Sequence, residues 1–98
     1  MAKLSTQTGM GTSYHRVSIR TTVNELIELI GEPQHSDNTG REKVNFMWEC
    51  ETSNEKVFTI YDWKQYQSLD LDEEFDFHIG AKDKITSIEA KYELLSLF

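Results

Sequence analysis

The sequence predicts an α+β fold: a three- to four-stranded antiparallel sheet, arranged as a meander, with two helices packed on one face. Three runs of alternating apolar and polar residues lie between residues 44 and 80, a short helical pattern precedes them, and a longer one follows. Helices placed before and after a run of strands are typical of two-layer α+β folds.

The size and composition favour one domain. The chain has 98 residues, of which 38% are hydrophobic and 28% are charged, enough apolar surface for a single core. Residues 1–13 are small and polar, so we expect a flexible N-terminal tail followed by a single α+β domain over residues 14–98. Residues 14–20 alternate weakly, which indicates a short strand or a coil leading into the first helix.

The first helix has a clear start and stop. Thr22 and Glu25 form a capping box, apolar residues from Val23 to Ile30 follow a helical spacing, and Gly31 ends the pattern. A helix of two turns is unstable alone, so its apolar side must pack on the sheet.

The predicted strands occupy VNFMWEC (44–50), VFTIYDWK (57–64) and FDFHIG (75–80). A polar tip joins the first two as a hairpin, and the acidic stretch 65–74 reads as a solvated loop before the third. Consecutive pairing gives a meander.

The final segment, residues 86–98, predicts the longer helix. Thr86 and Glu89 form a second capping box. The helical spacing places several apolar side chains on one stripe, which we expect to be the packing side: Ile85, Ile88, Tyr92 and Leu95, with Leu94 and Phe98 beside it.

Alternation gives the meander one apolar face and one polar-aromatic face. The second face carries Asn45, Met47, Glu49, Thr59, Tyr61, Trp63, Asp76 and His78. Tyr and Trp are common at binding hot spots because they bury a large area at low entropic cost. We therefore predict that a partner or ligand binds Met47, Tyr61, Trp63, Lys64, Asp76 and His78. Alternatively, the longer helix or a symmetry-related subunit covers these rings.

Two side chains on this face suggest specific chemistry. Lys64 beside Tyr61 and Trp63 suits an anionic planar ligand such as a nucleotide, whereas an ordinary cross-strand ion pair is the simpler alternative. His78 with Asp76 would serve a small hydrolase or nuclease if the two lay within hydrogen-bond reach. The simpler role for His78 is a structural hydrogen bond.

Other classes of site find no support in the sequence. The acids between Asp70 and Asp76 lack the spacing of a calcium loop, and no set of residues has the spacing of a zinc site. The single cysteine, Cys50, has no basic neighbour to activate it and excludes an internal disulfide. We predict no catalytic residue, no metal and no cofactor.

Charge and hydropathy restrict the partners. The net charge is −7, from 17 acidic and 10 basic residues, which disfavours nucleic-acid binding. The first residues lack the apolar run of a signal peptide or a membrane span, so we expect a cytoplasmic protein that does not bind membranes.

Several short motifs carry a resemblance to a known group. GEP at residues 31–33, YDWK at 61–64 and HIG at 78–80 resemble a pattern in small accessory proteins of tailed bacteriophages, over roughly residues 18–95. Phe77 stands where that pattern has Trp, which keeps an aromatic ring. The resemblance implies an accessory protein that is made during infection and blocks host factors, including defence systems. It supplies no catalytic residues.

Three functions follow as hypotheses. The first is a non-enzymatic phage protein that acts in the host cytoplasm and inhibits a host protein in defence or regulation through the ring-bearing face and acidic rim. The second is a sponge for a nucleotide-type immune signal, bound in a pocket at the subunit interface of a homo-oligomer. The third is a hydrolase or nuclease that uses His78 and Asp76.

Overall fold

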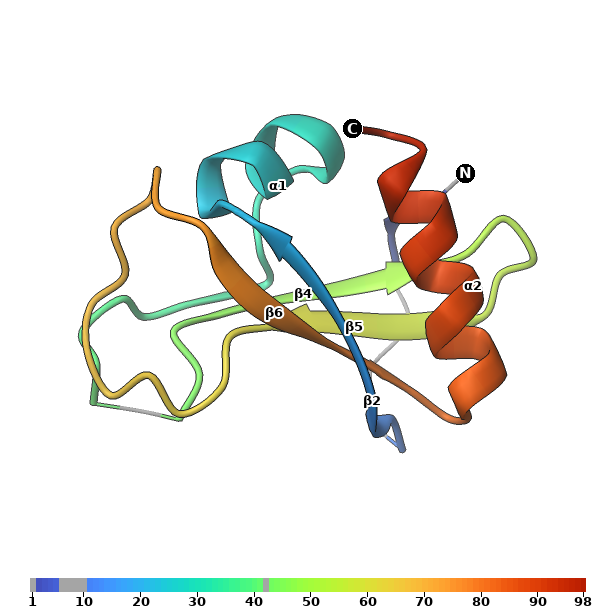
Figure 1. Ribbon diagram of the computed structural model, residues 1–98, viewed down its shortest axis with the longest axis horizontal. Coiled ribbons are helices and arrows are strands. Elements are labelled where there is room, and N and C mark those ends of the chain that lie inside the picture. Colours follow the sequence, from blue (N-terminus) through green and yellow to red (C-terminus); the bar gives the residue numbers. More distant parts are fainter. Residues whose placement is uncertain (1, 6–10, 42) are drawn as a thin grey trace.

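The computed structural model describes residues 2–5, 11–41 and 43–98, and it folds as an antiparallel sheet with two helices on one side (Figure 1). The strands follow the order β1-β4-β5-β6-β2, and β3 also pairs with β4. The elements are β1 (Lys3–Leu4), β2 (Ser13–Thr21), α1 (Val23–Ile30), β3 (His35–Ser36), β4 (Phe46–Glu51), β5 (Val57–Tyr61), β6 (Phe75–Ala81) and α2 (Lys84–Leu95).

The α+β class and the antiparallel sheet are confirmed, and β4, β5 and β6 pair consecutively as the expected meander. The described residues form six strands, however, and not three to four. β2 is nine residues long and pairs with β6, whereas β1 and β3 are two residues each and pair with β4. Two residues are too few to show a period of two, so the sequence pattern did not reveal β1 and β3.

Part of the segment that we assigned to a tail lies in the sheet. Lys3–Leu4 pairs with Glu51 and Cys50 of β4, and Ala2 is buried. Ser13 begins β2. Residues 1 and 6–10 of the predicted tail lie outside the described residues.

The first helix is confirmed at both ends. The Thr22 hydroxyl accepts a hydrogen bond from the Glu25 N–H at 3.0 Å, and the Gly31 N–H donates to the Ile27 carbonyl. Gly31 has a φ of 112°, a conformation that glycine adopts without a steric penalty. The indole Nε1 of buried Trp48 donates to the Gly31 carbonyl at 2.9 Å, so the end of α1 is tied to β4.

The second helix differs from the prediction in its cap and in its buried side. Asp83, not Thr86, caps α2, because its carboxylate accepts from the Thr86 N–H at 2.7 Å. The side chains that α2 buries are Thr86, Ser87, Ala90 and Leu94. The stripe that we expected to pack is exposed instead, at 67% for Ile85, 39% for Ile88, 71% for Tyr92 and 45% for Leu95. The helical spacing of apolar residues identified one apolar side of α2. It did not show that the opposite side, with the small residues Thr86, Ser87 and Ala90, packs closely against the sheet.

Candidate functional site: a ring cluster on the open face of the sheet

Of the predicted binding residues, Met47, Tyr61 and His78 lie in one row across the sheet. His78 of β6 pairs with Tyr61 of β5, and Tyr61 pairs with Met47 of β4. Ser18 extends the row on the β2 side, and His35 extends it on the β3 side. Adjacent residues such as Phe77, Ile60 and Trp48 point to the core, so this row points away from it.

This face is opposite the one that the helices cover (Figure 1). α2 packs on the core side of β2, β5 and β6. The alternative in which the longer helix covers the rings is therefore wrong. Within the described part of the chain, no helix covers this face.

Four aromatic side chains form what we call the ring cluster: Tyr14, Tyr61, Trp63 and His78. Tyr14 stacks on His78 with centroids 3.9 Å apart and planes 10° apart, and Tyr61 meets His78 edge-on at 5.5 Å. Trp63 lies 6.0 Å from Tyr61 and 6.4 Å from His78. Tyr14 and Trp63 are the exposed members, at 42% and 39%. The cluster is thus preorganised, with two rings available for contact.

The backbone of β2 places Tyr14 over His78. The pairing of β2 with β6 shifts between Tyr14 and Ser18, and Arg16 in this irregularity has a φ of 65°. Tyr14 consequently pairs with Gly80, one pleat beyond His78 on the same face. Tyr14 was not among the predicted site residues. The alternation of residues 14–20 indicates the side of the strand on which Tyr14 lies, but it does not show that this strand pairs with β6.

Gly80 provides the space that the cluster needs. A Cβ atom at this position would lie 2.5 Å from Thr59 Oγ1 and 3.4 Å from Tyr61 Cε1. The absence of a side chain therefore allows Thr59 and Tyr61 to pack over β6.

Two lysines flank the cluster at Trp63. The ammonium Nζ atoms of Lys43 and Lys64 lie 6.0 and 5.5 Å from the Trp63 ring centroid. The two segments are joined by a hydrogen bond of 2.7 Å from the Lys64 N–H to the Lys43 carbonyl. The two ammonium groups give this edge a local positive charge on a chain whose net charge is −7, and their cation–π contacts hold them at Trp63. Lys43, before the start of β4, was missed because its partner is distant in sequence.

A buried carboxylate holds these segments in place. Asp62 is 1% exposed, and its oxygens accept hydrogen bonds from the backbone N–H groups of Asn45 and Phe46 and from the Asn45 side chain, at 2.8 to 3.1 Å. Asn45 was expected on the open face, but it is fully buried and its amide also donates to the Gln67 carbonyl. The Asp62 carboxylate is thus used inside the fold, whereas the ammonium group of Lys64 lies beside Trp63.

Burial shifts the pKa of two members of the cluster. Loss of solvent lowers the pKa of His78, and the nearby Asp76 carboxylate opposes that shift. Loss of solvent raises the pKa of Tyr61, and the proximity of Tyr14 raises it further by a smaller amount. Both rings are therefore uncharged at neutral pH, and the local positive charge comes from the lysines.

Asp76 has an ion-pair partner of its own, Arg20. Its carboxylate accepts a hydrogen bond from Arg20 Nη1 at 3.3 Å, and Arg20 Nε lies 3.6 Å from Glu74. Asp76 follows the acidic loop, while His78 is packed against Tyr14. The structure thus brings together Met47, Tyr61, Trp63, Lys64 and His78 and gives Asp76 a different partner.

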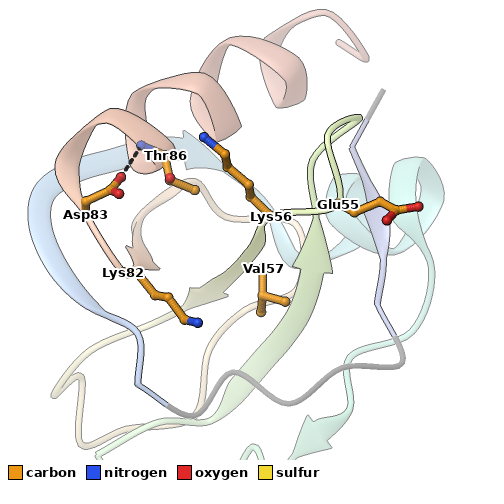
Figure 2. Close-up of a pocket in the computed structure, with 6 residues that line it drawn as sticks. All are labelled: Glu55, Lys56, Val57, Lys82, Asp83 and Thr86. Carbon is orange, nitrogen blue, oxygen red and sulfur yellow. Dashed lines mark hydrogen bonds between the residues drawn. The ribbon is translucent and has the colours of Figure 1, made fainter.

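The rest of the described chain offers few other chemical sites. Within residues 2–5, 11–41 and 43–98, no three His, Cys, Asp or Glu side chains gather as a metal site would require. Burial, with a smaller effect of Glu49, raises the pKa of the Cys50 thiol to about 12, so this thiol is unreactive. An open cavity of about 320 Å³ lies between the β4–β5 hairpin tip and the start of α2 (Figure 2). Its lining is of mixed charge: Glu55, Lys56, Val57, Lys82, Asp83 and Thr86.

Comparison of the chain with models of protein families, with curated proteins and with solved structures gave no match. Among the described residues, neither helix has the length and apolar character needed to cross a membrane.

Proposed function

We propose that this chain is a non-enzymatic phage accessory protein that binds and inhibits a host protein, in defence or regulation, and that the ring cluster is its contact surface. The observation that carries the proposal is the preorganised packing of Tyr14, Tyr61 and Trp63 around His78 on a face that the helices leave open. The phage setting and the inhibitory role rest on the GEP, YDWK and HIG motifs.

The chemistry of the cluster favours a particular kind of protein surface. Exposed Tyr and Trp rings held by neighbours bury apolar area with little loss of side-chain entropy. Lys43 and Lys64 beside Trp63 add positive charge. A partner segment that combines an apolar side chain with Asp or Glu is complementary to both features.

Affinity capture from a bacterial host lysate tests this function. The wild-type chain should retain one host protein, and Trp63→Ala and Tyr14→Ala should lose it. Tyr66→Ala is the matched control, because Tyr66 is 56% exposed and lies outside the cluster. Thermal melts of each variant separate loss of binding from loss of folding. Retention of the partner by both cluster variants contradicts the proposal.

Inhibition needs its own measurement. The activity of the captured host protein should decrease with added wild-type chain and be unaffected by Trp63→Ala. Lys43→Ala with Lys64→Ala should slow association and reduce its dependence on salt, whereas Lys82→Ala, an exposed lysine elsewhere, should not. Binding without a change in the activity of the host protein removes the inhibitory role.

A nucleotide-type ligand is the second candidate, and the two ammonium groups beside Trp63 favour it. A ligand with a phosphate and a base would pair with Lys43 and Lys64 and stack on an exposed ring. Cyclic and ADP-ribose-type nucleotides should then raise the melting temperature of the wild type and not of the double lysine variant. If no nucleotide raises the melting temperature, this candidate is rejected. If one does and no host protein is captured, nucleotide binding replaces inhibition of a host protein as the proposed function.

A hydrolase or nuclease has the least support, because Asp76 is paired with Arg20 and His78 is packed among rings. The substitution His78→Phe retains an aromatic ring but no proton acceptor. Under the binding proposal this variant keeps its biological effect, whereas a catalytic role for His78 requires that the effect disappear.

A further inference from the structure

Helix α2 has two apolar sides, and the domain uses only one. Ala90 and Leu94 are fully buried against the sheet, together with the small polar residues Thr86 and Ser87. On the other side, the exposed residues Ile85, Ile88, Tyr92 and Leu95 form what we call the outer stripe. A helix that is apolar on two sides is normally covered on both.

The outer stripe has the spacing of a coiled-coil seam. Its members are separated by 3, 4 and 3 residues, which places Ile85 and Tyr92 at position a and Ile88 and Leu95 at position d of a heptad. In the same frame, Ala90 is at position f and Leu94 at position c, on the opposite side of the helix. A helix already held by its own sheet can thus present a seam without an additional cost of folding.

We propose that the outer stripe of α2 packs against the outer stripe of a second copy of this chain, with the two helices parallel. The flanking charges select this occupant and this direction. In parallel coiled coils a residue at position g faces the e residue of the next heptad on the partner. Here Lys84 is at g and Glu89 at e, so the two-fold symmetry forms two Lys84–Glu89 pairs.

The antiparallel arrangement would oppose like charges. With Ile85 facing Leu95 and Ile88 facing Tyr92, each Glu89 lies beside the Glu89 of the other copy, and each Lys91 beside the other Lys91. Like charges at these flanks disfavour that direction.

The size of the outer stripe sets the expected strength. Stable interfaces bury roughly 800 Å² per partner, about 20–30 residues a side, and four side chains over three helical turns supply less. We expect a dimer with a dissociation constant in the range of about 1–100 μM. The ring cluster is on the opposite face of the sheet from α2, so the dimer would display two clusters and bind a multivalent host target with avidity.

Sedimentation velocity over a range of concentrations tests the dimer. The wild type should shift from monomer to dimer as its concentration rises. The double variant Ile85→Lys/Tyr92→Lys should remain monomeric, because it lacks the apolar side chains at both positions a of the heptad. Both side chains are about 70% exposed, so the fold should be retained, as circular dichroism would verify. Leu71→Lys is the matched control, since Leu71 is 40% exposed on a loop. A wild type that stays monomeric, or a double variant that still dimerises, overturns the proposal.

Disulfide trapping tests the direction. In a parallel pair, Ile85→Cys and Leu95→Cys each face their own copy, so each variant alone should form a disulfide-linked dimer. In an antiparallel pair, Ile85 faces Leu95, and only a mixture of the two variants would cross-link. Native Cys50 is fully buried and does not compete. Cross-linking only in the mixture overturns the parallel arrangement.

A charge exchange tests the flanking pair. Lys84→Glu should weaken the dimer several-fold by placing a glutamate opposite Glu89, and adding Glu89→Lys should restore it. If the second substitution does not restore dimerisation, the proposed Lys84–Glu89 contact is wrong. These measurements use no host protein, so they are independent of the function of the ring cluster.

Discussion

Tyr14 stacks on His78 with ring centroids 3.9 Å apart, and this contact joins the edge strand β2 to the middle of the ring cluster. The two residues are not directly paired, because the irregular pairing of β2 offsets Tyr14 by one pleat. The imidazole is therefore covered by an aromatic face on one side and lies within 6.4 Å of Trp63.

We predict that Tyr14→Ala raises the pKa of His78 towards its ordinary value of 6.5, because removal of the stacked ring returns water to the imidazole. The measurement is an NMR titration of the His78 ring protons. Tyr66→Ala is the control and should leave the titration unchanged. An unchanged pKa in Tyr14→Ala would show that other neighbours exclude the solvent.

His78 should also make stability depend on pH. Its pKa is lower in the folded protein than in the unfolded chain, so the unfolded chain takes up a proton first as the pH falls. The free energy of unfolding should decrease as the pH falls through 6.5, and this contribution should become constant below the folded-state pKa. Urea unfolding of the wild type and of His78→Gln between about pH 8 and about pH 5 measures the difference. Parallel curves for the two proteins contradict the prediction.

Asp62→Ala should destabilise the fold strongly. The substitution leaves the buried N–H groups of Asn45 and Phe46 and the Asn45 amide without an acceptor, and each such loss costs about 1–3 kcal/mol. We expect a decrease of about 3–5 kcal/mol in the free energy of unfolding, measured in urea. Asp76→Ala is the control, because its exposed pair with Arg20 contributes about 0–1 kcal/mol. A similar small effect at both positions would refute the structural role of Asp62.

Gly80→Ala should destabilise the protein and disturb the ring cluster. The added methyl group would lie 2.5 Å from Thr59 Oγ1, and overpacking of this kind costs about 1–3 kcal/mol. Thr59→Ala removes the closest atom, so in the double variant the second substitution should recover part of the loss. A double-mutant cycle of unfolding free energies measures this coupling. If the two changes in unfolding free energy are simply additive, the Gly80→Ala methyl group does not clash with Thr59.

Local patterns predicted the parts of the fold that depend on neighbouring residues. The bounds of α1 were predicted correctly because its cap and its stop, Thr22 and Gly31, lie directly beside the helix in sequence. The alternation of β4, β5 and β6 fixed which side chains point away from the core, so Tyr61 and His78 were placed on the same face.

Contacts between distant segments were not predictable from those patterns. The sequence showed neither that Tyr14 would reach His78 nor that Asn45 would be buried by Asp62, since both contacts depend on how β2 and the loops fold back on the sheet. The cap of α2 was misplaced at Thr86 because Asp83 lies just outside the repeating pattern.

The sequence alone determined that this protein is an α+β domain with an aromatic face, because spacing of 2 and of 3.6 residues is a property of single elements. The tertiary structure decided which of two apolar sides of α2 is buried, and it assembled Tyr14 and Lys43 with the predicted rings. The physical reason is that burial and ring stacking are properties of pairs of elements, and close packing of Ala90 and Leu94 on the sheet left Ile85 and Tyr92 in solvent.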